Sequence, residues 1–99
     1  GGSIMEVPIK FNSYIELFKL LKVKDFKKMR QWVTNNIDTD ASAIFRGLYD
    51  NAMDNLKPES LPQLILILAD YQYKHAFVAD HELNVVACLT EVMANVEFV

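Results

Sequence analysis

Apolar residues recur along this chain at the spacing of an α-helix, and this periodicity constrains the fold more than any other feature. They fall at i, i+3, i+4 and i+7 in five consecutive stretches that are separated by short polar breaks. A helix with one apolar face must pack that face against a neighbour, and a 99-residue chain has room for only one core. We therefore predict a single all-α domain of five helices.

Polar side chains that can cap a helix N-terminus, together with prolines, mark where the expected helices begin. A break near residues 23–24 separates the first two helices, and a polar loop over residues 35–40 separates the next two. A β-strand over residues 64–68 is an alternative, but the longer apolar pattern around it favours a helix. The residues expected to open the five helices are, in chain order, Asn12 or Ser13, Asp25, Asp40, Pro58 or Ser60, and Asp80.

The last two expected helices hold a surplus of apolar residues. They number 25 of the 39 residues from 61 to 99, against 26 of the 60 before them. The fifth helix is apolar almost all round, so it must be enclosed by its own domain or by a neighbouring subunit. We expect a subunit interface here, because interface cores are rich in apolar groups and poor in charge. The stripe expected to pack is Leu83, Val86, Ala87, Thr90, Met93 and Ala94, with further apolar positions at Val85, Leu89, Val92 and Val96.

Charge is distributed unevenly along the chain. Residues 1–30 hold seven basic and three acidic side chains, a net +4, whereas residues 31–99 hold three basic and ten acidic ones, a net −7. Such polarity favours head-to-tail association, although ordinarily solvated helix faces would give the same pattern. The basic run Lys24, Lys27, Lys28 and Arg30 is able to contact phosphates, but a solvated helix face is the commoner explanation.

Side chains that carry chemistry are few and scattered. No glycine-rich phosphate loop is present, and Gly47 lies within a helical pattern. His75, His81 and Cys88 are six and seven residues apart, which matches no common zinc pattern. Asp80 is more often a helix cap than a general base. We therefore expect no catalytic, cofactor-binding or metal-binding residues in this chain.

Cysteine usage and hydropathy indicate the compartment. A single cysteine in an apolar stretch fits a reduced, cytoplasmic protein, and the longest nearly apolar run, residues 64–69, is too short to span a membrane. The opening Gly1-Gly2-Ser3 is typical of an expression tag. We interpret residues 1–10 as tag remnant and linker, and residues 11–99 as a helical domain excised from a longer protein.

The segment Gln72-Tyr73-Lys74-His75-Ala76-Phe77-Val78-Ala79-Asp80-His81-Glu82-Leu83, with the apolar helix after it, carries a family resemblance. An aromatic or basic end to one helix, a turn of small residues, and an Asp two residues before a Glu are similar to the collar domain of sliding-clamp loader small subunits of the replication factor C type. Lys24 to Arg30 resembles the family's second helix, and the resemblance covers residues 11–98. Val78 and Lys74 replace a Gly and an Arg of many cellular members, which favours the clamp loaders of T4-like bacteriophages.

The resemblance implies a five-helix bundle of the orthogonal type whose work is assembly. In that family, collars pack side by side and hold a pentamer together for DNA replication. Separate AAA+ modules bind ATP and Mg²⁺, the sliding clamp and primer–template DNA. Those modules are absent from this chain, so we expect no ATPase activity, other loader subunits as partners, a homo-oligomer as one form of assembly, and a cytoplasmic location in the host cell. The expected subunit-interface residues are Tyr73, His75, Phe77, Glu82, Val85, Leu89 and Val92.

Two other classes of function are alternatives to the collar domain. A free-standing adaptor would bind an amphipathic partner helix in a groove between the fourth and fifth helices. A small helical enzyme would need a convergent polar cluster, for which Asp80, His81 and Glu82 are the candidates.

Overall fold

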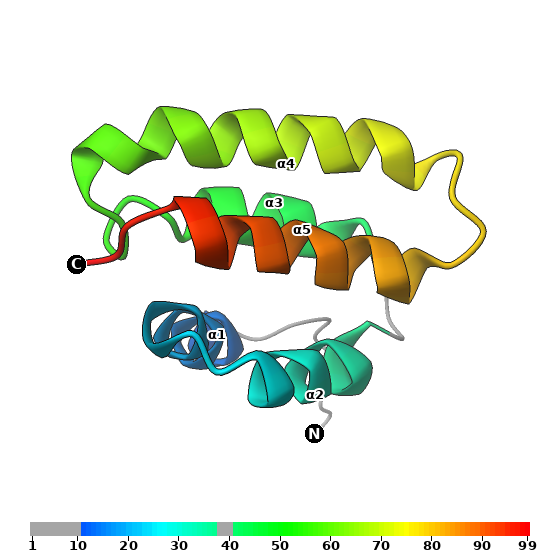
Figure 1. The fold of residues 1–99 in the computed structure, drawn as a ribbon, viewed down its shortest axis with the longest axis horizontal. Helices are drawn as coiled ribbons and strands as arrows, with labels where there is room; N and C mark the ends of the chain where they lie inside the picture. The colour runs from blue at the N-terminus through cyan, green and yellow to red at the C-terminus, as the bar shows by residue number, and fades with distance from the viewer. Residues whose placement is uncertain (1–10, 38–40) are drawn as a thin grey trace, which may run out of the picture.

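Five α-helices follow one another along the part of the chain that the structure describes (Figure 1). The structure, a computed structural model, describes residues 11–37 and 41–99. No β-strand occurs in these residues, so the prediction of an all-α fold is confirmed. The elements are α1 (Phe11–Val23), α2 (Phe26–Asn36), α3 (Ala43–Asp50), a 3₁₀ turn (Pro58–Ser60), α4 (Leu61–His75) and α5 (His81–Asn95).

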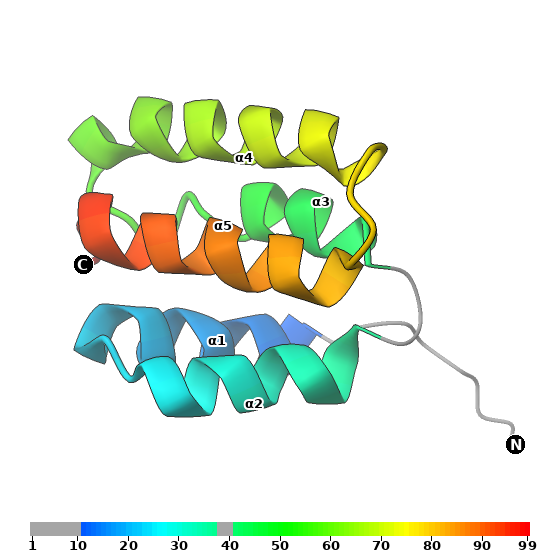
Figure 2. The ribbon, with the colours of Figure 1, turned by 45° about the vertical axis from the view of Figure 1, so that its right-hand side comes forward.

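Helix α5 lies at the centre of the bundle. Figures 1 and 2 show α4 on one side of it and α1 and α2 on the other, and α5 packs against all three. In Figure 1, α1 is seen nearly end-on while α4 and α5 run across the view, so α1 crosses the direction of these two helices. A helix enclosed on both sides needs apolar residues around most of its circumference, which explains the composition of α5.

The capping residues predicted for α2 and α5 are confirmed. The carboxylate of Asp25 accepts a hydrogen bond from the Lys28 N–H at 3.1 Å, and that of Asp80 accepts one from the Leu83 N–H at 3.0 Å. Both bonds satisfy donors that a helix N-terminus leaves without an intrahelical partner.

Other helix starts differ from the prediction by a few residues. Helix α1 begins at Phe11, and α3 begins at Ala43 with Ser42 at the N-cap position. Both alternatives for α4 hold in part, because Pro58 opens the 3₁₀ turn and Ser60 immediately precedes the α-helix. The expected cap Asp40, like the expected tag and linker over residues 1–10, lies outside the described residues.

The end of the chain pairs with the segment between α3 and α4, which the sequence did not predict. The Lys57 N–H donates to the Glu97 carbonyl and the Val99 N–H donates to the Asn55 carbonyl, both at 3.0 Å. The buried core that this segment helps to close comprises Tyr14, Leu17, Phe18, Leu21, Met29, Trp32, Val33, Ile44, Phe45, Leu48, Ala52, Leu56, Leu64, Ile67, Leu68, Val85, Cys88, Leu89, Val92, Met93 and Val96.

Candidate interaction surface

Three of the seven expected interface residues lie in the core of the domain. Val85, Leu89 and Val92 on α5 have no exposed surface. They are therefore not available for the expected subunit interface, because the neighbours that enclose α5 are helices of the same chain. Leu83, by contrast, was expected on the packed stripe and is exposed. Most of the apolar residues of α5 are therefore buried within the domain and stabilise its fold.

His75 and Glu82 are half-buried, and both contact side chains of this chain. The His75 ring stacks on His81 with 4.2 Å between centroids and meets Phe45 edge-on at 5.3 Å. Glu82 Oε2 accepts a hydrogen bond from the Thr34 hydroxyl at 2.9 Å, which joins α5 to α2. These two residues therefore stabilise one end of the bundle and offer a partner only part of their surface.

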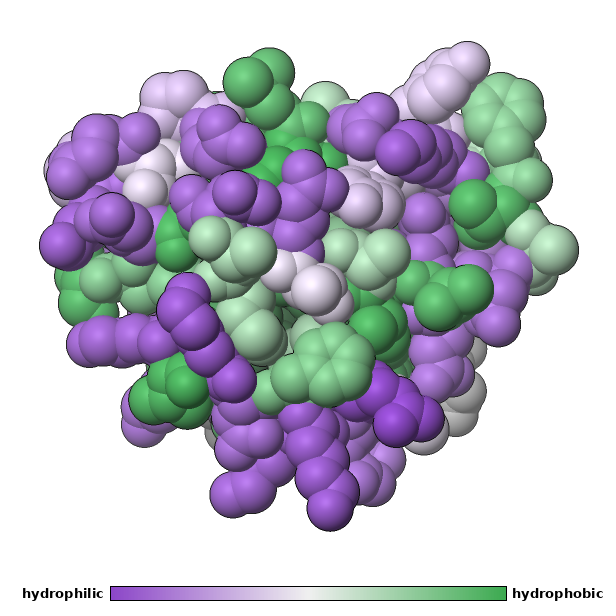
Figure 3. All heavy atoms as spheres, viewed as in Figure 1, coloured by the Kyte–Doolittle hydropathy of each residue, from purple (hydrophilic) through white to green (hydrophobic). Residues whose placement is uncertain are grey.

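Tyr73 and Phe77 are the exposed members of the expected set. Their exposed fractions are 70% and 72%, and their rings lie against each other with 5.2 Å between centroids. Figure 3 shows hydrophobic atoms gathered at this end of the molecule, over the turn between α4 and α5. Exposed aromatic pairs of this kind are enriched at protein interfaces.

The apolar surface continues along α4 toward its N-terminus. Leu66, two turns before Tyr73 on the same side of the helix, is 68% exposed, and Ile65 beside it is also exposed. An ion pair between Asp70 and Lys74, at 3.0 Å, lies between these apolar groups. We call this surface the α4 outer face, defined by Ile65, Leu66, Tyr73 and Phe77.

An apolar hollow of about 350 Å³ lies between α3 and α4. Tyr49 and Met53, both exposed, form one wall, and Leu61 and Ile65 form the other. A neighbouring hollow of about 200 Å³ shares Tyr49 and Ile65, so the two make one groove, which we call the α3–α4 groove. The adaptor hypothesis placed its groove between the fourth and fifth helices, but those pack directly against each other. The apolar groove lies on the α3 side of α4.

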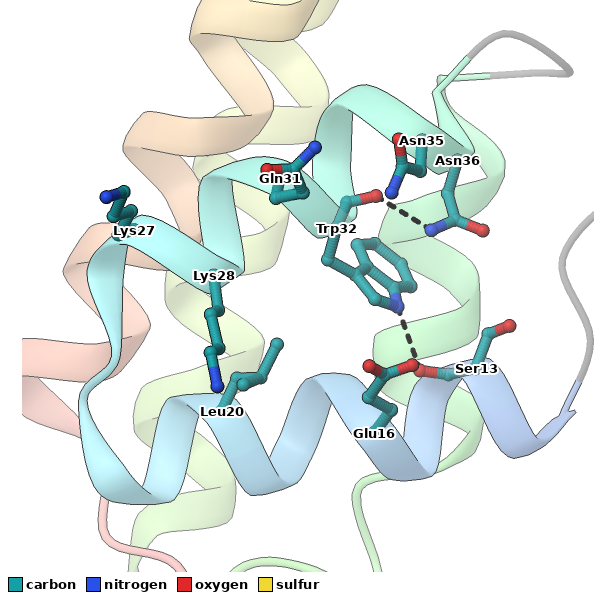
Figure 4. A pocket seen from close by; sticks show the side chains of 9 residues that line it. All are labelled: Ser13, Glu16, Leu20, Lys27, Lys28, Gln31, Trp32, Asn35 and Asn36. Atoms are coloured by element: carbon teal, nitrogen blue, oxygen red, sulfur yellow. Dashed lines mark hydrogen bonds between the residues drawn. The ribbon is translucent and has the colours of Figure 1, made fainter.

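A further hollow of about 450 Å³ between α1 and α2 is lined mostly by polar residues (Figure 4). Inside it the Trp32 indole N–H donates to the Ser13 carbonyl at 3.0 Å, and the Asn36 side-chain amide donates to the Trp32 carbonyl at 2.7 Å. Both hydrogen bonds are internal to the domain. The Trp32–Ser13 bond fixes α2 on α1, whereas the Asn36–Trp32 bond lies within α2.

The basic run of α2 does not converge on one point. The Lys24 amino group donates to the Met93 carbonyl at 2.6 Å and so ties the α1–α2 turn to the last turn of α5. Lys27 and Lys28 border the polar hollow together with Glu16, whose negative charge opposes anion binding there. The cations are spread along the surface, an arrangement that attracts an acidic partner through its overall field.

Titratable groups in the interior are held in their neutral forms. Burial, with a smaller contribution from the nearby charge of Glu91, raises the pKa of the Cys88 thiol to about 12. A thiol of this kind is not a nucleophile at neutral pH. Among residues 11–37 and 41–99, no group of three histidine, cysteine or carboxylate side chains is placed to hold a metal ion. Over the same residues, every helix is too short or too polar to cross a membrane.

No protein-family model matches the chain, and none of the curated proteins is significantly similar to it. We therefore infer function from the α4 outer face, the α3–α4 groove and the residues that carry the collar resemblance.

Proposed function

We propose that this chain is an assembly domain, the oligomerisation collar of a sliding-clamp loader small subunit. The observation that carries the proposal is the α4 outer face, on which Ile65, Leu66 and Tyr73 of α4 and Phe77 of the following turn are open to solvent. Clusters of exposed apolar side chains mark interaction sites on globular proteins. The order of the helices and the Asp80 cap after the α4–α5 turn also agree with the collar resemblance.

The proposed partners follow from the same reading. Other loader subunits would bind through the collar to form a pentamer that serves DNA replication, and a homo-oligomer is one form of that assembly. ATP, Mg²⁺, the sliding clamp and primer–template DNA would bind AAA+ modules elsewhere in the full-length protein. We therefore propose a non-enzymatic, cytoplasmic role for this domain.

The free energy available from the α4 outer face is modest. Burying one large apolar side chain completely contributes about 1.5–3 kcal/mol, so four that start partly exposed contribute roughly 4–8 kcal/mol. Association costs about 4–15 kcal/mol in lost freedom of motion. The most favourable balance of these two values, about 4 kcal/mol, corresponds to a Kd of about 1 mM, so self-association through this face alone is expected at about millimolar concentration. It is strengthened where several contacts act together.

Sedimentation equilibrium of the chain, from about 10 µM to about 1 mM, tests the proposal. We expect reversible self-association that Leu66→Ser weakens about tenfold, since this change removes apolar surface from the α4 outer face without touching the core. Ile15→Ser, on the exposed side of α1, is the matched control and should leave association unchanged. A chain that stays monomeric throughout the range, or an equal loss in both variants, would contradict the proposal.

The α3–α4 groove supports a second candidate, an adaptor that binds an amphipathic helix of another protein. The groove is apolar and open, as helix-binding grooves are. Binding of an amphipathic helix by a chain that does not self-associate would favour this function over the collar.

A further inference from the structure

The turn between α1 and α2 carries an exposed apolar knob, formed by Val23 and Phe26. Their exposed fractions are 68% and 47% although they flank a tight turn of the backbone. Lys24, between them, adopts φ 59°, a left-handed conformation that is costly for a residue with a side chain. Two exposed apolar groups at one turn form a small apolar projection that is available for contact with a partner.

The knob is held rigidly. The Asp25 N–H donates to the Leu20 carbonyl at 3.0 Å, the Asp25 carboxylate caps α2, and the Lys24 amino group is bonded to the end of α5. A rigid projection loses little conformational freedom when it enters a partner, so more of its contact energy appears as affinity.

Charge and shape at the α3–α4 groove complement the knob. Residues 11–37, which carry the knob, hold six basic and two acidic side chains, a net +4. The groove's walls hold Asp50 and Arg46, which form an ion pair at 3.1 Å, and the exposed Asp54 and Glu59 lie within two residues of its lining in the chain. Residues 41–99, which carry the groove, hold three basic and eight acidic side chains, a net −5. Its apolar hollow of about 350 Å³ is within the size range of pockets that take up small ligands, enough for an aromatic and a branched side chain.

We infer that the knob of one copy of this chain inserts into the α3–α4 groove of a second copy. Knob and groove are different surfaces, on opposite sides of α5 (Figure 2), so the contact is heterologous and each copy presents both halves of it. Repetition of such a contact builds a ring or a filament. The inference rests on the proposed assembly function and adds to the α4 outer face a second contact, whose groove shares Ile65 with that face.

Mixing two variants tests this contact. Phe26→Ser removes the knob, and Ile65→Lys puts a cation in the groove, where it opposes the basic turn. Each variant alone should associate at least about tenfold more weakly than the unaltered chain, because neither can form the contact with itself. An equimolar mixture should recover association as a heterodimer that does not grow further, since one knob and one groove remain intact. Trp32 fluorescence verifies that both variants are folded.

The alternatives give different results. If the unaltered chain self-associates but Phe26→Ser has no effect, or if the mixture recovers no heterodimer, the knob–groove contact is overturned while the assembly function stands. A chain that is monomeric at every concentration overturns both. Binding of a DNA duplex to the basic turn, lost in Lys27→Glu with self-association unchanged by Phe26→Ser, would assign the turn to nucleic acid and overturn the inference.

Discussion

At the scale of single residues, Gly47 is the position where the fold tolerates least change. It lies in α3 beneath the Tyr14 ring, and a methyl group there would overlap that ring. Tyr14 cannot easily move away, because it is buried against Trp32, with 5.8 Å between ring centroids, and its hydroxyl lies 3.4 Å from the Ala43 carbonyl. Glycine therefore permits α1 and α3 to approach each other closely.

Gly47→Ala is expected to destabilise the domain by about 1–3 kcal/mol through overpacking, a cost larger than the gain of about 1 kcal/mol in helix propensity. Urea unfolding followed by the fluorescence of Trp32 measures this change. In a Tyr14→Ala background the methyl group has room, so the same substitution should there be neutral or stabilising. Equal destabilisation in both backgrounds would show that the Tyr14 ring is not the cause.

At the scale of secondary-structure elements, the caps of α2 and α5 fix where two helices begin. Asp25→Ala and Asp80→Ala each remove a side-chain acceptor from a helix N-terminus, and each should lower the free energy of unfolding by about 1 kcal/mol. Thermal unfolding followed by circular dichroism measures the loss. Asp54→Ala, an exposed carboxylate outside any helix, is the control and should change stability by less than half as much.

The same two helices show what the sequence predicts and what it leaves open. Asp25 and Asp80 were predicted as caps because capping depends on residues within one turn of each other. The buried side of α5 was assigned wrongly, since apolar residues occur all around that helix and periodicity cannot choose among them. For this reason Val85, which was expected at a subunit interface, is buried, and Leu83, which was expected to be packed, is exposed. Phe98 packs on Phe18, with 6.1 Å between ring centroids. This contact joins residues far apart in the sequence, so no local pattern could predict it.

At the scale of the whole molecule, the many apolar residues of 61–99 fall into a buried and an exposed group. Most of those on α5 are enclosed by α1, α2 and α4 and stabilise the domain itself. The share on the α4 outer face remains in water, because α4 has packed partners on only part of its circumference. The candidate surface for assembly thus lies within residues 61–99, where an interface was expected. It lies on α4, however, whereas most of the expected interface residues lie on α5.

The stability of the whole domain should also depend on alkaline pH. Burial raises the pKa of Cys88 from 9.0 to about 12 and that of Tyr14 from 10.0 to about 12, with a smaller contribution from the charge of Asp50 to the latter. Because both groups lose their protons more readily in the unfolded chain, their contribution to stability is complete below about pH 9. It is lost as the pH rises through 12.

Urea unfolding at neutral pH and at about pH 10.5 measures this loss, which we expect to be about 2 kcal/mol for Cys88 alone. Cys88→Ala lowers stability at both values because it leaves a small cavity, but it should reduce the difference between them by about that amount. The thiol should correspondingly react with a disulfide reagent only as fast as the domain unfolds. A pH dependence unchanged by Cys88→Ala, or rapid modification of the folded chain, would show that the thiol is not buried as described.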